Sequence, residues 1–325
     1  MTDRRALAAV LAILAAAPLL ATALDEPYYV AFVTRVMIFA LAAVSLDLIL
    51  GFGGMVSFGH AAFFGLGAYV VAILAHHDVS GTPVLTWPIM VPGTSSAVIS
   101  WPLAALAAGL FALATGWICL RTSGVNFIMI TLAFAQMLYY LSTSARAYGG
   151  DEGLTLWQRS TLGPLPIEND VVFCYLVLAL LAIVLLGARR VVSARFGVVL
   201  TGGRDNERRM ISLGFPTFRY KLAAYVISAS LCGLAGALVA NQTEFVSPTF
   251  LHWARSGEIL VMVILGGIGS LVGPVVGAAI LLLLEEVLSD LTQHWQIVLG
   301  PILLLVVLFA RRGFYGLLVR ESRHG

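Results

Sequence analysis

Long apolar runs separated by short polar stretches extend along the whole chain. A run of about 20 apolar residues crosses a bilayer as a helix that rises about 1.5 Å per residue. Runs of this kind cover residues 6–24, 28–50, 51–75, 99–120, 124–144, 171–188, 222–240, 258–284 and 295–310. The pattern predicts an all-α polytopic membrane protein in which residues 1–325 form one transmembrane domain of roughly 8–10 segments.

Two glycine-rich stretches interrupt this pattern. Residues 258–284 contain a cluster of glycines and one proline, which predicts two half-length pieces joined near Ser270, a broken or re-entrant pair. Residues 51–68 and 265–278 also share a rhythm of Gly-Gly, Ser, Gly and Gly-Ala. They are either halves of an inverted repeat that meet in the membrane, or helix contacts whose glycines recur by composition alone.

The first 24 residues fit two interpretations. Arg4 and Arg5 precede an apolar run that ends in small residues at 21–23, as in a cleavable signal peptide. The run is also long enough for a first helix that stays in the protein, and we favour that interpretation.

Composition and charge agree with a membrane protein. Hydrophobic residues make up 60% of the chain and charged residues 11%, whereas about a quarter of an ordinary globular domain is charged. Residues 189–221, here called the basic loop, carry seven arginines and one lysine. If both termini and this loop are cytoplasmic, 15 of the 19 basic residues lie inside, as the positive-inside rule requires. The acidic group Glu285, Glu286 and Asp290 has no basic residue near it in sequence and fits the outer side.

The basic loop contains a predicted short helix. Asp205 caps its start, Glu207 favours its first turn, and Gly214 ends it in a left-handed turn. Met210 and Leu213 fall on one face. The loop either only fixes the topology, or it is a docking helix whose Met210 and Leu213 contact a cytoplasmic protein within a rim of arginines.

Polar residues inside the spans are candidates for a translocation path. In glycine-rich or helical spans such residues either line a path or satisfy one another in helix packing, and both interpretations stay open. The candidates are Ser57, His60, Asn126, Gln136 and Ser270. Arg35 and Asp47 lie near span ends, where we expect structural roles.

Motifs for other chemistry are absent from the sequence. It has no phosphate-binding Gly-x-x-x-x-Gly-Lys-Ser/Thr loop, no nucleophile elbow and no His-Glu-x-x-His or Cys-x-x-Cys pair, so we expect no enzyme and no bound cofactor. The cluster at 76–78 has two histidines and an aspartate but no fourth ligand at a useful spacing, so we expect no metal site. The three cysteines lie in or beside apolar spans and suggest no disulfide framework.

Four stretches resemble a known family. They are "GRDNERRMISLGFPTFRYKLAAYVISASLCGLAGAL" at 203–238, "GFGGMVSFGHAAFFGLGAY" at 51–69, "RTSGVNFIMITLAFAQMLYY" at 121–140 and "LGGIGSLVGPVVGA" at 265–278. In combination they resemble permease subunits of ATP-binding cassette importers for branched-chain amino acids, specifically the LivM-like half. The likeness covers nearly the whole chain after residue 50.

The resemblance implies a function and a set of partners. The chain would form half of a translocation path for neutral apolar amino acids, in the inner membrane, with a paralogous permease, two cytoplasmic ATPases and a periplasmic or lipid-anchored substrate-binding protein. ATP and Mg would be bound by the ATPases, and no nucleic acid is involved. The implied ATPase-docking residues are Arg204, Asp205, Glu207, Arg208, Met210, Leu213 and Gly214. The alternatives are a permease for urea or short amides and, from another class, an ATP-independent channel or secondary transporter.

Overall fold

A computed structural model describes residues 2–23, 26–85, 91–163, 166–291, 294, 297–298 and 300–301. The longer helices are α1 (Thr2–Ala23), α2 (Pro27–Leu50), α3 (His60–Ser80), α4 (Ala97–Cys119), α5 (Val125–Ser144), α6 (Asp170–Ser193), α7 (Arg195–Asp205), α9 (Thr217–Thr243), α10 (Trp253–Gly266) and α11 (Gly273–Leu291). The shorter elements are α8 (Glu207–Ser212), η1 (Arg146–Tyr148), η2 (Pro248–Leu251), β1 (Pro83–Leu85), β2 (Val91–Pro92), β3 (Leu154–Thr155) and β4 (Phe245–Val246). In the described part of the chain six helices are long and apolar enough to cross a membrane, so the predicted all-α polytopic fold is confirmed.

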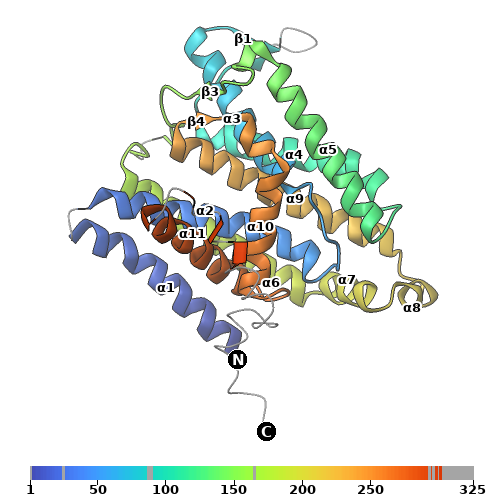
Figure 1. The fold of residues 1–325 in the computed structure, drawn as a ribbon. Helices are drawn as coiled ribbons and strands as arrows, with labels where there is room; N and C mark the ends of the chain where they lie inside the picture. Colours follow the sequence, from blue (N-terminus) through green and yellow to red (C-terminus); the bar gives the residue numbers. More distant parts are fainter. Residues whose placement is uncertain are drawn as a thin grey trace.

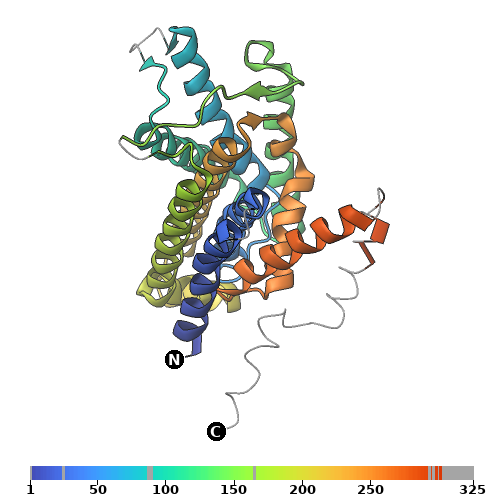
Figure 2. The ribbon, with the colours of Figure 1, turned by 90° about the vertical axis from the view of Figure 1, so that its left-hand side faces the viewer.

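The two ends of the helix bundle differ in character. Two small antiparallel pairs, β1 with β2 and β3 with β4, lie at one end, and α7 and α8 lie at the other (Figures 1 and 2). The first residues of α1 are at the same end as α7 and α8 in both views. The basic loop and the start of the chain therefore share one side of the bundle.

The centre of the bundle depends on small residues. On α3 and α9, a methyl group at Gly67 would overlap the backbone of Gly233, and one at Gly236 would overlap the carbonyl of Phe64. Ala108 of α4 faces Gly233 from the other side. Small residues of this kind let helix backbones approach closely in a membrane, where the packing itself must hold helices together.

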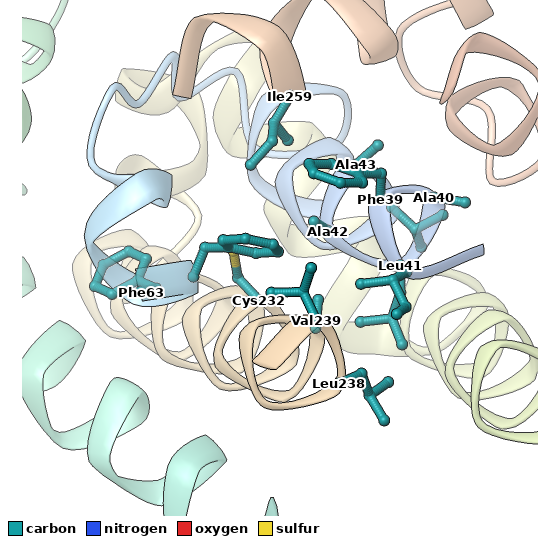
Figure 3. Close-up of a cluster of buried hydrophobic side chains, with 14 of the residues drawn as sticks. Phe39, Ala40, Leu41, Ala42, Ala43, Phe63, Cys232, Leu238, Val239 and Ile259 are labelled. Carbon is teal, nitrogen blue, oxygen red and sulfur yellow. The ribbon is translucent and has the colours of Figure 1, made fainter. Parts of the chain in front are cut away.

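Larger apolar side chains fill the space around these contacts. Figure 3 shows Phe39 of α2, Phe63 of α3, Cys232 and Val239 of α9 and Ile259 of α10 converging on one buried cluster. All five are buried. The most buried of the candidate spans is α2, with 89% of its apolar window covered by the rest of the chain, so it is the central helix.

The predicted break near Ser270 is confirmed, and the structure shows its geometry. Helices α10 and α11 are joined by residues 267–272 and pack antiparallel, since a methyl group at Gly277 would overlap the Met262 carbonyl and one at Gly266 would overlap Gly273. The break is thus a tight helical hairpin whose joint lies at the α7–α8 end.

The two glycine-rich stretches of the sequence meet at that joint. Gly51, at the end of α2, touches Gly269 in the joint. From this point α3 and α11 both run toward the end that carries the strands (Figures 1 and 2). These two stretches therefore enter from the same side, which differs from the antiparallel relation of inverted halves.

Three boundaries differ from the sequence prediction. The third span was expected from residue 51, but α3 begins only at His60, because the glycines before it form an irregular segment. Helix α6 continues to Ser193 and α9 begins at Thr217, so both ends of the basic loop are helical. The predicted last span, 295–310, lies mostly outside the described residues, as do Arg311 and Arg312.

The acidic group on α11 has a basic partner in space, although none lies near it in sequence. Arg35 of α2 pairs with Glu285 at 3.6 Å, and the Tyr28 hydroxyl donates to Glu286. Sequence distance hid these contacts, because α11 runs antiparallel to α2 and returns to its start. Arg35 therefore has a partner within the bundle, in keeping with a structural role.

Candidate functional site

An irregular, largely buried segment, residues 51–59, joins α2 to α3 without forming a helix. Backbone groups in a membrane interior need hydrogen-bond partners, so such a segment exists only where protein or a cavity surrounds it. Its partners come from distant helices: Phe58 N donates to Thr131 Oγ1 at 3.3 Å, and Ser256 Oγ donates to Phe58 O at 2.8 Å. The segment is thus held between α5 and α10.

His60 follows this segment and is fully buried. Its Nε2 lies 2.9 Å from Ser228 Oγ, and that hydroxyl in turn donates to the Ser45 carbonyl. The ring stands edge-on to Phe63, with 5.6 Å between ring centroids. His60 therefore links α2, α3 and α9 as a packing residue in this conformation, while its buried Nδ1 has no hydrogen-bond partner among the described residues.

Ser57 and Ser270 also have local structural explanations. Ser57 Oγ accepts from Gly59 N at 3.1 Å and is buried. Ser270 Oγ donates to Gly267 O at 2.7 Å and accepts from Gly273 N at 3.2 Å, which closes the joint before α11. Each hydroxyl satisfies backbone groups that a helix would otherwise pair.

Asn126 and Gln136 lie on α5, away from this network. Asn126 is exposed and Gln136 is half-buried, whereas Thr131 on the opposite face is buried. Only 17% of the apolar window of α5 is covered by this chain, so one long face of the helix is free. The five sequence-predicted path residues are consequently divided among the 51–60 region, the α10–α11 joint and the open face of α5.

The basic loop folds into two short helices rather than one. Helix α7 ends at Asp205, and an extended break at Asn206 precedes α8. The cap predicted at Asp205 is therefore displaced by one residue: Asn206 Oδ1 accepts from Arg209 N at 3.0 Å, while Asp205 pairs with Arg204 at 3.0 Å. Glu207 is in the first turn as predicted.

Two contacts fix α8 to the start of α9. Glu207 Oε1 lies 2.7 Å from Lys221 Nζ and accepts from Thr217 Oγ1 at 3.2 Å. Gly214 follows α8 with φ of 87°, the left-handed conformation that the sequence predicted for it. The helix is held by side chains on its inner side and leaves its outer side free.

That outer side carries an apolar patch different from the predicted one. Met210 is half-buried and its side chain packs against Gly202 of α7. Leu213 is 65% exposed as predicted, and its exposed apolar neighbours are Ile211, at 56%, and Phe215. Arg208 is exposed beside them. Ile211 and Phe215 were not among the predicted docking residues, although apolar residues inside a basic loop are a signal that the sequence already contains.

A cavity of about 280 Å³ with a mixed polar and apolar lining lies between this loop and the bundle. It is lined by Gly53 and Gly54 of the irregular segment, by the turn at 122–124, and by Arg204 and Lys221. The α7 end therefore borders both the solvent and the irregular segment. Among the described residues no group of His, Cys, Asp and Glu is arranged to hold a metal ion, and His77 instead contacts Thr82 at 2.7 Å.

Comparison with known proteins identifies the family of this chain. A family model described as "Branched-chain amino acid transport system / permease component" matches residues 28–308. The chain belongs to this family. The matched residues include the irregular segment, the open face of α5, α7 and α8, and the α10–α11 hairpin. The chain is thus a multi-pass membrane permease of a transport system, as the sequence resemblance implied.

Individual relatives agree with the family. The high-affinity branched-chain amino acid transport system permease protein LivM of Salmonella typhimurium is 27% identical over 304 residues, covering 86% of this chain and 68% of the relative. LivM of Escherichia coli gives the same figures. LivH of Escherichia coli, another permease protein of such a system, is 22% identical over 86% of this chain and 91% of its own length. No solved structure matches the chain.

Proposed function

We propose that this chain is one permease subunit of an ATP-binding cassette importer and carries branched-chain amino acids through half of a translocation path. The supporting observation is a membrane bundle of this permease family whose basic end carries the exposed apolar residues Ile211, Leu213 and Phe215, next to a helix that Glu207 ties to α9. A free-standing channel has no need of such a patch, whereas a subunit driven by cytoplasmic ATPases requires a surface on which they act.

The docking surface in this proposal is α7 and α8 with the turn after them. Leu213, Ile211 and Phe215 form its apolar centre, and Arg204, Arg208 and Asp205 its charged rim. Glu207 and Gly214 hold the shape of the surface, and Met210 supports it from within. ATP and Mg are bound by the ATPase subunits, and hydrolysis occurs there.

The path in this proposal runs along the open face of α5, where a second permease completes it. Asn126 and the edge residue Gln136 are the predicted path residues on that face, which also carries the exposed Tyr140 and Ser144. Ser57, His60 and Ser270 take part only when the bundle changes conformation, because their hydrogen-bond partners lie within the chain. An external binding protein delivers the amino acid at the end that carries the strands.

The orientation follows from the charges. With α7, α8 and the start of α1 in the cytoplasm, the basic loop lies on the inner side of a bacterial inner membrane. Arg159 at the opposite end is paired with Asp170 at 2.7 Å and Glu244 at 3.0 Å, so it adds little to the charge there. The start of α1 is cytoplasmic in this orientation.

The proposal is tested by uptake of labelled leucine and labelled urea into proteoliposomes that hold the complete transporter, with ATP inside or absent. Leucine uptake that requires ATP is the expected result. ATP-dependent uptake of urea alone would support an ATP-driven permease with urea, not leucine, as its substrate. Uptake of either compound at the same rate without ATP would contradict the proposal in favour of a channel or secondary transporter.

A further inference from the structure

The two glycine joints of the bundle touch at the end where α7 lies. Gly51 ends α2, and its N–H donates to Asp47 O at 2.7 Å. A methyl group at Gly51 would overlap Gly269 N and Cα and the Asp47 carboxylate. Gly269 itself has φ of 77°, a conformation that favours glycine. The end of α2 and the α10–α11 joint therefore meet backbone to backbone, at a contact that only glycine permits.

Asp47 fastens this contact. Its side chain lies in the last turn of α2 with 1% of its surface exposed, and Oδ1 accepts from Gly269 N at 2.8 Å. A buried carboxylate is costly in a membrane protein and is retained where it has a function or a specific partner. The partner here is a backbone N–H of the joint, so the position of the joint depends on this carboxylate.

Arg204 reaches the same glycine from the docking surface. It lies in the last turn of α7, and its Nη1 donates to Gly51 O. Its Nε donates to Asp205 Oδ1 at 3.0 Å, which orients the guanidinium. The aliphatic part of Arg204 also lies against Gly54 of the irregular segment. One side chain thus connects α7 with the end of α2 and with the segment that follows it.

We propose that Arg204, Gly51, Asp47 and Gly269 form a continuous connection that transmits movement of α7 and α8 to the α10–α11 hairpin. Arg204 and Asp47 act as positioning residues: neither touches the transported molecule, and both keep the two joints moving together. Each step is a hydrogen bond or a backbone contact, so a shift of α7 reaches the hairpin through the Arg204 guanidinium, which Asp205 orients, and through the buried Asp47 carboxylate. This inference rests on the proposed function, because it presupposes that ATPases move α7 and α8.

The connection is tested by the number of substrate molecules taken up per ATP hydrolysed in proteoliposomes with the complete transporter. Asp47→Ala removes the acceptor for Gly269 N and is expected to lower this ratio about tenfold, within the usual range of coupling energies, while hydrolysis continues. Asp47→Asn keeps an acceptor oxygen of the same shape and is expected to retain the ratio. The matched control is Arg190→Ala, which removes an exposed arginine at the end of α6.

A double variant decides whether the two residues act in one connection. If they do, Arg204→Ala with Asp47→Ala lowers the ratio no further than the more severe single variant, whereas independent residues would give multiplied losses. Multiplied losses, an unchanged ratio for Asp47→Ala, or equal damage from Asp47→Asn would overturn the inference. If Asp47→Ala fails to assemble, Arg204→Ala decides in complexes that keep their ATPases, because Arg204 also lies in the rim of the docking surface. An unchanged ratio in those complexes would overturn the inference. Failure of the wild-type complex to use ATP would instead contradict the proposed function.

Discussion

Single residues show what a sequence can and cannot reveal about polar groups in membrane helices. Ser57, His60 and Ser270 stand out in the sequence because polar side chains are rare in spans. The structure gives each of them a partner from the chain itself. Those partners are either backbone groups freed by glycines or residues far away in sequence, such as Ser228, so the sequence alone left their roles open.

The hydroxyl of Ser228 provides a residue-scale prediction. It lies between His60 Nε2 and the Ser45 carbonyl and is fully buried, so Ser228→Ala leaves buried polar groups without partners. We expect the free energy of unfolding in detergent to fall by about 1–3 kcal/mol.

The control for this prediction is Ser212→Ala. Ser212 is exposed and bonds only the nearby Arg208 carbonyl, at 3.0 Å, so its loss is expected to change stability by less than about 0.5 kcal/mol. Equal stability losses for both variants would contradict the role given to Ser228.

At the scale of elements, the sequence located the helices better than their ends. The N-terminal cap of α8 was predicted at Asp205 but is Asn206. Both residue types cap helices and the two residues are adjacent, so the sequence did not distinguish them. Helix α7 was not predicted, since Gly202 and Gly203 argue against a helix, yet Gly202 leaves the space in which Met210 packs. Glycines also explain the late start of α3. The sequence prediction counted the glycines before His60 as part of a helix, but in the structure they form the irregular segment.

The α10–α11 hairpin leads to an element-scale prediction. Gly277 faces the Met262 carbonyl so closely that no side chain fits, and overpacking of this kind costs about 1–3 kcal/mol or more. Gly277→Val is therefore expected to lower the thermal unfolding temperature of the purified protein. Gly257→Val, in the first turn of α10, is the matched control, because nothing lies within 4 Å of the position where its side chain would begin. A larger loss at 257 than at 277 would refute the close packing of the hairpin.

At the scale of the whole molecule, the class of fold and the family followed from the sequence, because apolar runs, charge asymmetry and four motifs all agree. The spatial division of the path residues did not follow, since it depends on which face of α5 the rest of the chain covers. The uncovered face carries Met129 and Met137, which are 62% and 64% exposed. In our account this face meets a second permease.

A photoreactive amino acid tests that placement. Placed at Met137, it is expected to crosslink the partner permease in the purified transporter. Placed at Ile183 of α6, which is 65% exposed but on a different helix, it is expected to crosslink lipid instead. A permease crosslink from position 183 and none from position 137 would show that our account places the second subunit on the wrong face.

The central claim is that ATPases drive this permease through the patch around Leu213, and one comparison tests it most directly. Leu213→Asp places a charge in the patch, whereas Val79→Asp places one at a similarly exposed site, 62% against 65%, at the opposite end of the bundle. The measurement is co-purification of the ATPase subunits together with ATP-dependent leucine uptake. We expect Leu213→Asp to lose both, by about tenfold or more as for a central interface residue, and Val79→Asp to keep its ATPases. A Leu213→Asp permease that inserts, binds its ATPases and transports normally would show that the coupling surface lies elsewhere.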